Sequence, residues 1–242
     1  MTLVTNPYQL LYGWARFFVF LTCLGWSLIA QVQAETLAVV VRSQNMPEYP
    51  QGMEISEDTE IRTDANQQIA LKTRQGDILV ANKNSTIKLV KPGFFQHLFG
   101  KIYYFIAPRK QNNVQVETTT ATIGVRGTKF LIDSAGSAQK QDSVALSEGM
   151  LNFESRDDVL FELYNQRELT EFELFRRQMQ SEFDAFKQQL EEEFVAYQNS
   201  IDLESGFSLA FDGKRVVRMP NDAGIEMQFR EFEAFISENS AE

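Results

Sequence analysis

Few side chains in this 242-residue sequence have the type and spacing that catalysis requires. His97 is the only histidine, and it lies among Phe94, Phe95, Leu98 and Phe99. A catalytic triad needs a nucleophile and an acid placed around the histidine, and a histidine metal site needs further ligands. The sequence points to neither arrangement, so we interpret His97 as a structural residue.

The acidic residues and glycines are also poor candidates for chemistry. Glu191, Glu192 and Glu193 are expected on a helix as a solvated face, because they lack the Asp, Asn and Gly spacing of a calcium-binding loop. Paired carboxylates for glycoside hydrolysis need a cleft, which nothing in the sequence predicts. Gly124 and Gly127 lie in strand context, so they do not predict a phosphate-binding loop. We therefore expect a protein that is not an enzyme and has no cofactor or metal ion.

Arg126 is the polar residue with the strongest claim to a role. It lies in the stretch Thr118–Phe130, TTTATIGVRGTKF, in which apolar side chains change from odd to even positions across Gly127 and Thr128. Because side chains alternate between the faces of a strand, this change of phase predicts a β-bulge, and Gly is the least costly residue for one. Arg126 is then either a structural residue, paired with an acid such as Glu148 or with backbone carbonyls, or a residue that recognises a partner.

This stretch resembles the signature of the FecR domain, a periplasmic module named after the ferric-citrate transport regulator. The Thr-rich strand of the signature is similar to Thr118–Thr120. Its apolar-Gly-apolar-Arg-Gly-Thr run is similar to Ile123–Thr128, which contains Gly124, Arg126, Gly127 and Thr128. These four residues are the candidate family motif.

The resemblance continues on both sides of the motif and covers about residues 47–170. Upstream, Ile69–Leu89 is similar to the paired strands of the family. Downstream, Val144–Phe153 is similar to its closing hairpin, with Glu148 and Gly149 at the turn. The resemblance implies a protein-binding or signalling module. In the named regulators, this domain receives a signal from an outer-membrane transporter and passes it to a cytoplasmic anti-sigma segment.

The N-terminal residues 1–34 predict export. Arg16 precedes the apolar run Phe17–Ala30, which is too short to span a hydrocarbon core of ~30 Å comfortably. Small or apolar residues at Val32 and Ala34 predict a signal peptide that is cleaved after Ala34, which places the protein in the periplasm or outside the cell. An uncleaved N-terminal membrane anchor is the alternative. Because so few residues precede the apolar run, we expect no cytoplasmic anti-sigma domain.

Composition limits the partners further. Cys23 is the only cysteine, and it lies in the segment that we expect to be removed, so the mature protein would have no thiol. The formal net charge is −10, which argues against nucleic acid as a partner, because binding phosphates requires clustered Lys and Arg. Another protein of the cell envelope, or a second copy of the chain, is the expected partner.

Residues 35–170 predict an all-β domain, either a solenoid-like or a sandwich arrangement of short strands. The first strand is expected at TLAVVV, which begins at Thr36. Later strands are expected at Gln68–Thr73, Asp77–Ala81, Ser85–Val90, Lys101–Ala107 and Val159–Tyr164.

Residues 171–204 predict a long amphipathic helix. Thr170 and Glu173 form a capping box, and the apolar positions repeat every 11 residues, which places them along one helix face. This candidate packing or partner-binding stripe consists of Phe172, Phe175, Met179, Phe183, Phe186, Leu190, Phe194, Tyr197 and Ile201. The stripe either packs on the protein itself or joins it to a partner, and self-association would make the protein a scaffold subunit of an envelope assembly.

Residues 205–242 predict a β-hairpin and a C-terminal helix. Gly206 is expected to end the long helix, and Asp212-Gly213 favours a tight hairpin turn. A last helix is expected after Pro220, and its residues Glu231–Phe235 repeat the aromatic unit of the long helix.

Overall fold

The computed structural model describes residues 35–109, 114–136, 141–156, 160–165 and 196–237. These residues form a mainly β structure with fifteen strands in one sheet. The strands are β1 (Thr36–Gln44), β2 (Glu54–Ser56), β3 (Thr59–Arg62), β4 (Gln68–Thr73), β5 (Ile78–Ala81), β6 (Thr86–Lys91), β7 (Phe94–Phe105), β8 (Val114–Glu117), β9 (Ala121–Ser134), β10 (Asp142–Ser155), β11 (Phe161–Asn165), β12 (Ala196–Gln198), β13 (Ser200–Glu204), β14 (Phe207–Phe211) and β15 (Arg215–Pro220). One helix, α4 (Ala223–Ser237), follows them, and it is not long and apolar enough to cross a membrane.

Three long strands divide this sheet into two layers. The first half of β7 pairs with β6 and β8, whereas its second half pairs with β5 and β9. β9 and β10 change partners in the same way along their length. The first layer has the order β12-β11-β15-β14-β10-β9-β7-β5-β4-β1-β2, and the second has the order β3-β6-β7-β8-β9-β10-β13. Because the order ends at β12 and β2, the sheet is not closed.

A glycine with a positive φ lies where each long strand passes between the layers. Gly100 in β7 has a φ of 81°, Gly127 in β9 has 60° and Gly149 in β10 has 94°. Residues with a Cβ rarely adopt this conformation. Each of the three glycines therefore lets its strand bend without interruption and take part in both layers.

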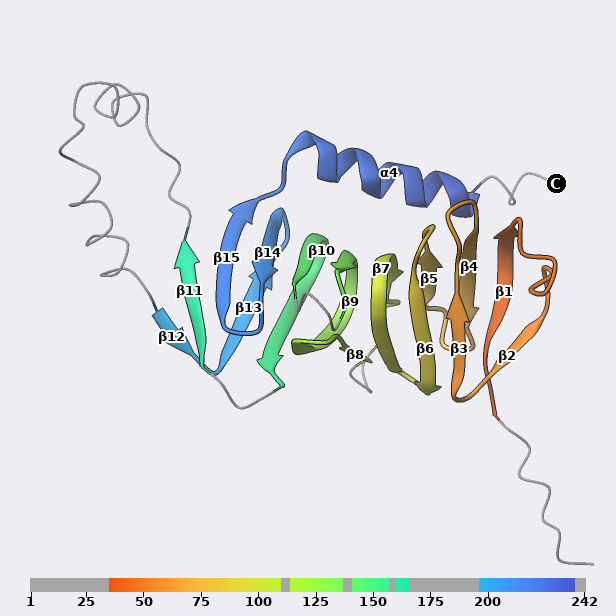
Figure 1. Ribbon diagram of the computed structural model, residues 1–242, viewed down its shortest axis with the longest axis horizontal. Coiled ribbons are helices and arrows are strands. Elements are labelled where there is room, and N and C mark those ends of the chain that lie inside the picture. Colours follow the sequence, from red (N-terminus) through yellow and green to blue (C-terminus); the bar gives the residue numbers. More distant parts are fainter. Residues whose placement is uncertain (1–34, 110–113, 137–140, 157–159, 166–195, 238–242) are drawn as a thin grey trace, which may run out of the picture. The chain divides into compact units, whose positions relative to one another are not determined.

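The main core lies between the layers, and a helix covers the outer face of the first. In β4, Ile69 and Leu71 belong to the main core, whereas Ala70 between them belongs to a second apolar cluster on the other face. That second cluster contains three phenylalanines of α4, namely Phe229, Phe232 and Phe235. Figure 1 shows α4 crossing the strands from β14 toward β4.

The start of α4 follows from its sequence. The Asp222 carboxylate accepts a hydrogen bond from the Ile225 N–H at 2.8 Å, so it satisfies one of the free donors at the helix N-terminus. The three phenylalanines recur every three residues, which places them on one helix face. The predicted hairpin before the helix is also confirmed, as β14 and β15 flank a turn at Gly213, which has a φ of 100°.

Two sequence predictions are wrong. The helix expected to reach Glu204 does not do so, because 196–198 and 200–204 form β12 and β13. In β13, Ile201 and Leu203 alternate with polar residues and are buried, which suits a strand at the edge of the second layer. The hairpin expected at Val144–Phe153 is one continuous strand, β10, in which Gly149 marks a bend.

Candidate functional site

The family motif forms the predicted β-bulge between β9 and β10. Arg126 pairs with Met150 and Lys129 pairs with Glu148, so Gly127 and Thr128 together lie opposite the single residue Gly149. One strand thus carries one more residue than its partner at this point. The change of phase in the sequence predicts this feature, and its placement at Gly127 is confirmed.

A second irregularity restores the register one step later. Lys129 pairs with Glu148, and the next residue of β9, Phe130, pairs with Leu146, so Ser147 is the extra residue on β10. The two bulges compensate each other, and the inward side chains of both strands stay in the core on either side of the bend. Phe130 and Leu146 are both fully buried.

Gly149 and Gly127 are packed closely against their neighbours. A Cβ at Gly149 would lie 2.5 Å from Cγ2 of Thr128 and 2.7 Å from the carbonyl oxygen of Gly127. A Cβ at Gly127 would lie 3.4 Å from Cα of Pro108. Gly149 is therefore needed for close contact as well as for its φ, whereas at Gly127 the positive φ is what favours glycine.

Arg126 does not pair with Glu148, which is one of the alternatives that the sequence leaves open. Glu148 instead accepts a hydrogen bond from Nζ of Lys129 at 2.8 Å, and this bond raises the pKa of Lys129. Arg126 is exposed, and within the described part of the chain it forms no hydrogen bond or ion pair with another residue. Its neighbour across the strands, Met150, is 56% exposed.

We define the motif face as Gly124, Arg126, Met150 and Asn152, which lie together on the outer surface of the second layer. Gly124 pairs with Asn152 and Arg126 with Met150 across β9 and β10. Asn152 also donates a hydrogen bond to Asp202 of β13 at 2.8 Å. Whereas α4 covers the outer face of the first layer, no described helix lies over this one.

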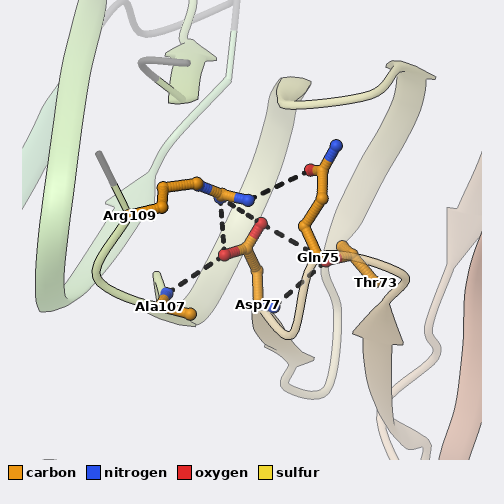
Figure 2. Close-up of polar contacts among 5 residues, drawn as sticks. All are labelled: Thr73, Gln75, Asp77, Ala107 and Arg109. Carbon is orange, nitrogen blue, oxygen red and sulfur yellow. Dashed lines mark hydrogen bonds and ion pairs between the residues drawn. The ribbon is translucent and has the colours of Figure 1, made fainter. Parts of the chain in front are cut away.

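A buried ion pair anchors the loop that supports the motif. The Asp77 carboxylate is fully buried, and Nη2 of Arg109 lies 2.6 Å from each of its oxygens. Asp77 also accepts a hydrogen bond from the Ala107 N–H at 3.0 Å. Figure 2 shows these contacts converging on Asp77 from the segment that follows β7.

The turn between β4 and β5 completes this network. Thr73 donates its hydroxyl to Asp77 at 3.3 Å and accepts a bond from the Asp77 N–H at 3.0 Å. Arg109 further donates to the side chain of Gln75 at 3.2 Å (Figure 2). Because Pro108 lies between these anchors and against Gly127, the network holds the loop against the bulge.

The Thr-rich segment before β9 is also structural. The Thr118 hydroxyl donates to the Ala121 carbonyl at 3.2 Å and accepts a hydrogen bond from the Ala121 N–H at 3.1 Å. Thr120 donates its hydroxyl to the buried Asp142 carboxylate. These bonds fix the entry of β9 into the second layer.

His97 is buried and structural, in agreement with its interpretation from the sequence. Its Nε2–H donates to the carbonyl oxygen of Gly100 at 2.8 Å, and its Nδ1 accepts from the Tyr104 hydroxyl at 3.1 Å. Burial lowers the pKa of His97 from 6.5 to about 4. The neutral imidazole therefore supports the bend of β7 at Gly100.

Small-molecule and metal sites are not evident in the described part of the chain. No three His, Cys, Asp or Glu side chains of these residues come together as metal ligands. A pocket between Glu35, Arg74 and Lys91 has a volume of about 30 Å³, which is close to that of one water molecule.

The aromatic stripe lies largely outside the described residues. This applies to Phe172, Phe175, Met179, Phe183, Phe186, Leu190 and Phe194. Its last two members lie on strands, Tyr197 in β12 and Ile201 in β13. Ile201 is buried in the main core.

Comparison with known proteins decides the family of this domain. Residues 59–154 match the family model described as FecR protein. These residues form a FecR domain. The match begins with β3 and extends almost to the end of β10, so it contains the motif, the bulge and the Asp77–Arg109 pair.

Comparison with solved structures finds a likeness to two crystal structures of a protein from Parabacteroides distasonis, which is described as a candidate anti-sigma factor. They were determined at 1.65 Å and 2.50 Å resolution. Each is 10% identical to this FecR-domain chain, with a TM-score of 0.48 over 71% of this chain and 64% of the other. This chain thus spans less than two thirds of that protein. No curated protein sequence matches the sequence of this chain.

The Asp77–Arg109 network was not predicted. Asp77 follows Gly76 and begins the strand expected at Asp77–Ala81, and 32 positions separate it from Arg109. The only local signal is an acid at a turn that directly precedes a buried strand, β5.

Proposed function

We propose that this FecR-domain protein is a non-enzymatic, protein-binding module of cell-envelope signalling, and that its motif face contacts the partner. The observation that carries this proposal is the position of Arg126. It is exposed beside Met150 on a sheet face that no described helix covers, within the segment that matches the FecR family. Arg and Met are among the residues enriched at protein interfaces.

The surroundings of Arg126 support a binding role over a purely structural one. Glu148, the acid that could have neutralised it, is bonded to Lys129. The bulge and the buried network beneath it fix the backbone on which Arg126 lies. A rigid backbone lowers the entropy cost of binding. An exposed guanidinium can pair with a carboxylate through two hydrogen bonds, so the expected partner presents an acidic residue beside an apolar one.

We further propose that the protein acts in the periplasm or outside the cell after cleavage following Ala34. The apolar run and the small residues before Glu35 support this location. N-terminal sequencing of protein extracted from the envelope should then begin at Glu35. A sequence that begins at Met1 or Thr2 would favour the membrane-anchored alternative.

The binding proposal is tested by cross-linking and pull-down from the envelope fraction with single variants. Arg126→Glu should abolish recovery of the partner, and Met150→Asp should reduce it. Arg62→Glu makes the same charge change on the distant strand β3, where Arg62 is exposed, and Met227→Asp changes an exposed methionine of α4. Both controls should recover the partner as the unmodified protein does.

Two results would contradict the proposal. If Arg126→Glu and Arg62→Glu reduced recovery of the partner equally, the net charge of the protein, rather than the motif face, would govern binding. Recovery of the protein's own copies alone would support the alternative, a scaffold subunit that self-associates through its aromatic helix.

A further inference from the structure

Helix α4 shows how the aromatic unit of this chain can bind a protein surface. Its residues 231–235 read EFEAF, and residues 171–175 and 182–186 read EFELF and EFDAF. All three units have Phe at the second and fifth positions and an acid at the first and third. The unit at 193–197 reads EFVAY and lacks the second acid.

The surface under α4 is a single row of side chains across the first layer. Register pairs join Ala70 to Val80, Val80 to Tyr103, Tyr103 to Leu131 and Leu131 to Ala145. All five belong to the apolar cluster that contains the α4 phenylalanines. We call these five residues the α4 row. Small residues at both of its ends, Ala70 and Ala145, leave room for the helix.

The second and fifth positions of the unit supply its apolar contacts. Phe232 stacks on Tyr103, with ring centroids 5.7 Å apart and planes 9° from parallel. The Phe235 ring lies under the Arg42 guanidinium at 4.4 Å, and the Phe235 carbonyl accepts a hydrogen bond from Arg42 at 2.8 Å. Both phenylalanines are buried.

The third position of the unit is also recognised. Glu233 accepts a hydrogen bond from the Tyr103 hydroxyl at 3.5 Å and lies 3.3 Å from Nζ of Lys129. The α4 row, together with Arg42 and Lys129 beside it, thus contacts a phenylalanine, an acid and a second phenylalanine in a fixed order. Glu173 and Asp184 supply that acid in the two matching upstream units.

The unit at 171–175 is the better match to α4. In α4, Phe229 lies two residues before the unit and packs edge-on against Tyr103, at 6.2 Å between centroids. The corresponding residue is Leu169 for the first upstream unit and Gln180 for the second. Of the two units, only the first therefore carries an apolar residue at all three positions held by Phe229, Phe232 and Phe235, and binding in this way extends the helix upstream of the N-cap expected at Thr170.

The position of β11 decides which copy of the row this unit can reach. Five strand spacings separate β11 from β7, the strand that carries Tyr103, which is about 24 Å at ~4.8 Å each. From Asn165, the end of β11, the four steps to Leu169 reach at most ~14 Å. The row of the same chain is therefore too distant, whereas this limit of reach does not apply to the row of a second copy.

We propose that the α4 row is a binding site for helices with this Glu-Phe-acid-x-Phe unit, and that residues 169–175 of a second copy occupy it by displacing α4. Because α4 is attached to the row, its effective concentration is in the millimolar range for a short linker. Exchange between copies is therefore weak in the resting protein, and it increases when α4 is loosened.

The test uses the full-length chain and a labelled peptide of residues 167–179, with binding followed by fluorescence anisotropy. The chain with Phe232→Ser and Phe235→Ser, in which α4 is weakened, should bind the peptide at least ten-fold more tightly than the unmodified chain. A peptide with Phe172→Ser and Phe175→Ser should not bind. Adding Tyr103→Ala to the weakened chain should remove binding. Equal binding of both peptides, or no binding to the weakened chain, would overturn the proposal.

A second measurement avoids the risk that the weakened chain fails to fold. Two chains, each with Cys23→Ser, carry either Glu168→Cys, at the position that corresponds to Gln228, or Lys101→Cys, whose Nζ lies 2.7 Å from the Gln228 side chain, and they are mixed before treatment with a short bis-maleimide. A cross-linked mixed dimer is expected, and Phe172→Ser on the Glu168→Cys chain should reduce its yield at least five-fold. A yield that does not depend on Phe172, or the absence of a mixed dimer at high protein concentration, would overturn the proposal.

Discussion

Gly149 and Thr128 face each other across the two central strands at van der Waals distance. A Cβ at Gly149 would lie 2.5 Å from Cγ2 of Thr128, and Gly149 has a φ of 94°. Neither strand can move away freely, because each takes part in both layers. This contact is therefore the least tolerant point of the bulge.

Gly149→Ala should lower the free energy of unfolding by about 2–4 kcal/mol, because it adds steric overlap to the cost of a positive φ. Gly206→Ala is the matched control. Gly206 has a φ of 84° and no atom within 4 Å of its Cβ position, so its variant should lose only about 1 kcal/mol. Urea denaturation measures both values, and equal losses would show that the contact with Thr128 does not matter.

The Asp77–Arg109 pair should contribute strongly to stability. Arg109→Ala leaves the fully buried Asp77 carboxylate without its cation, which should cost about 3 kcal/mol. Arg62→Ala, which changes an exposed arginine of β3, should stay within about 0.5 kcal/mol of the unmodified protein. A urea midpoint that is the same for both variants would contradict the importance of the network.

His97 should make stability depend on pH in a predictable direction. Burial lowers its pKa from 6.5 to about 4, so the unfolded chain binds a proton more readily than the folded one. The contribution of neutral His97 to the free energy of unfolding is complete above pH 6.5. It is lost as the pH falls toward 4, with a slope of up to ~1.4 kcal/mol per pH unit. His97→Gln should flatten this slope between pH 6.5 and 5.

The imidazole signal gives a direct check of the same prediction. Because His97 is the only histidine, its NMR resonances are unambiguous. They should show a neutral ring with the proton on Nε2 down to about pH 5. A titration midpoint near 6.5 in the folded protein would rule out the buried position.

Phe232 should be the main anchor of α4. Phe232→Ala removes a ring that stacks on Tyr103 and should cost about 3 kcal/mol, together with part of the helical circular dichroism signal. Met227→Ala, at a side chain that is 58% exposed, should change little. If the two variants had the same thermal midpoint, α4 would not be held by its aromatic face.

The sequence predicted the elements whose signals are local. The hairpin at Asp212-Gly213 and the bulge at Gly127 depend on a few adjacent residues, and both are confirmed. The strands between Gln68 and Val90 were also expected close to their observed bounds. In each case, the period of the apolar side chains and the turn residues predict the same element within one short segment.

The features that were not predicted depend on distant parts of the chain. Gly149 signals a turn as well as a bend, and only its pairing opposite Gly127 and Thr128 decides between them. Ile201 fits the 11-residue helical repeat, but with Leu203 it also fits a strand, and pairing with β10 decides the outcome. The partners Asp77 and Arg109 are brought together only when β5 pairs with β7.

The order of α4 after the strands that it covers has a consequence for biogenesis. The strands that carry the α4 row are all complete by Ser155, whereas the helix that covers them begins at Ala223. During synthesis, an aromatic and aliphatic strip centred on Tyr103 therefore stays open to solvent until residues 223–237 have emerged. We expect a nascent chain in this state to bind a holdase chaperone, and its release would then coincide with the arrival of the fifteen-residue helix α4.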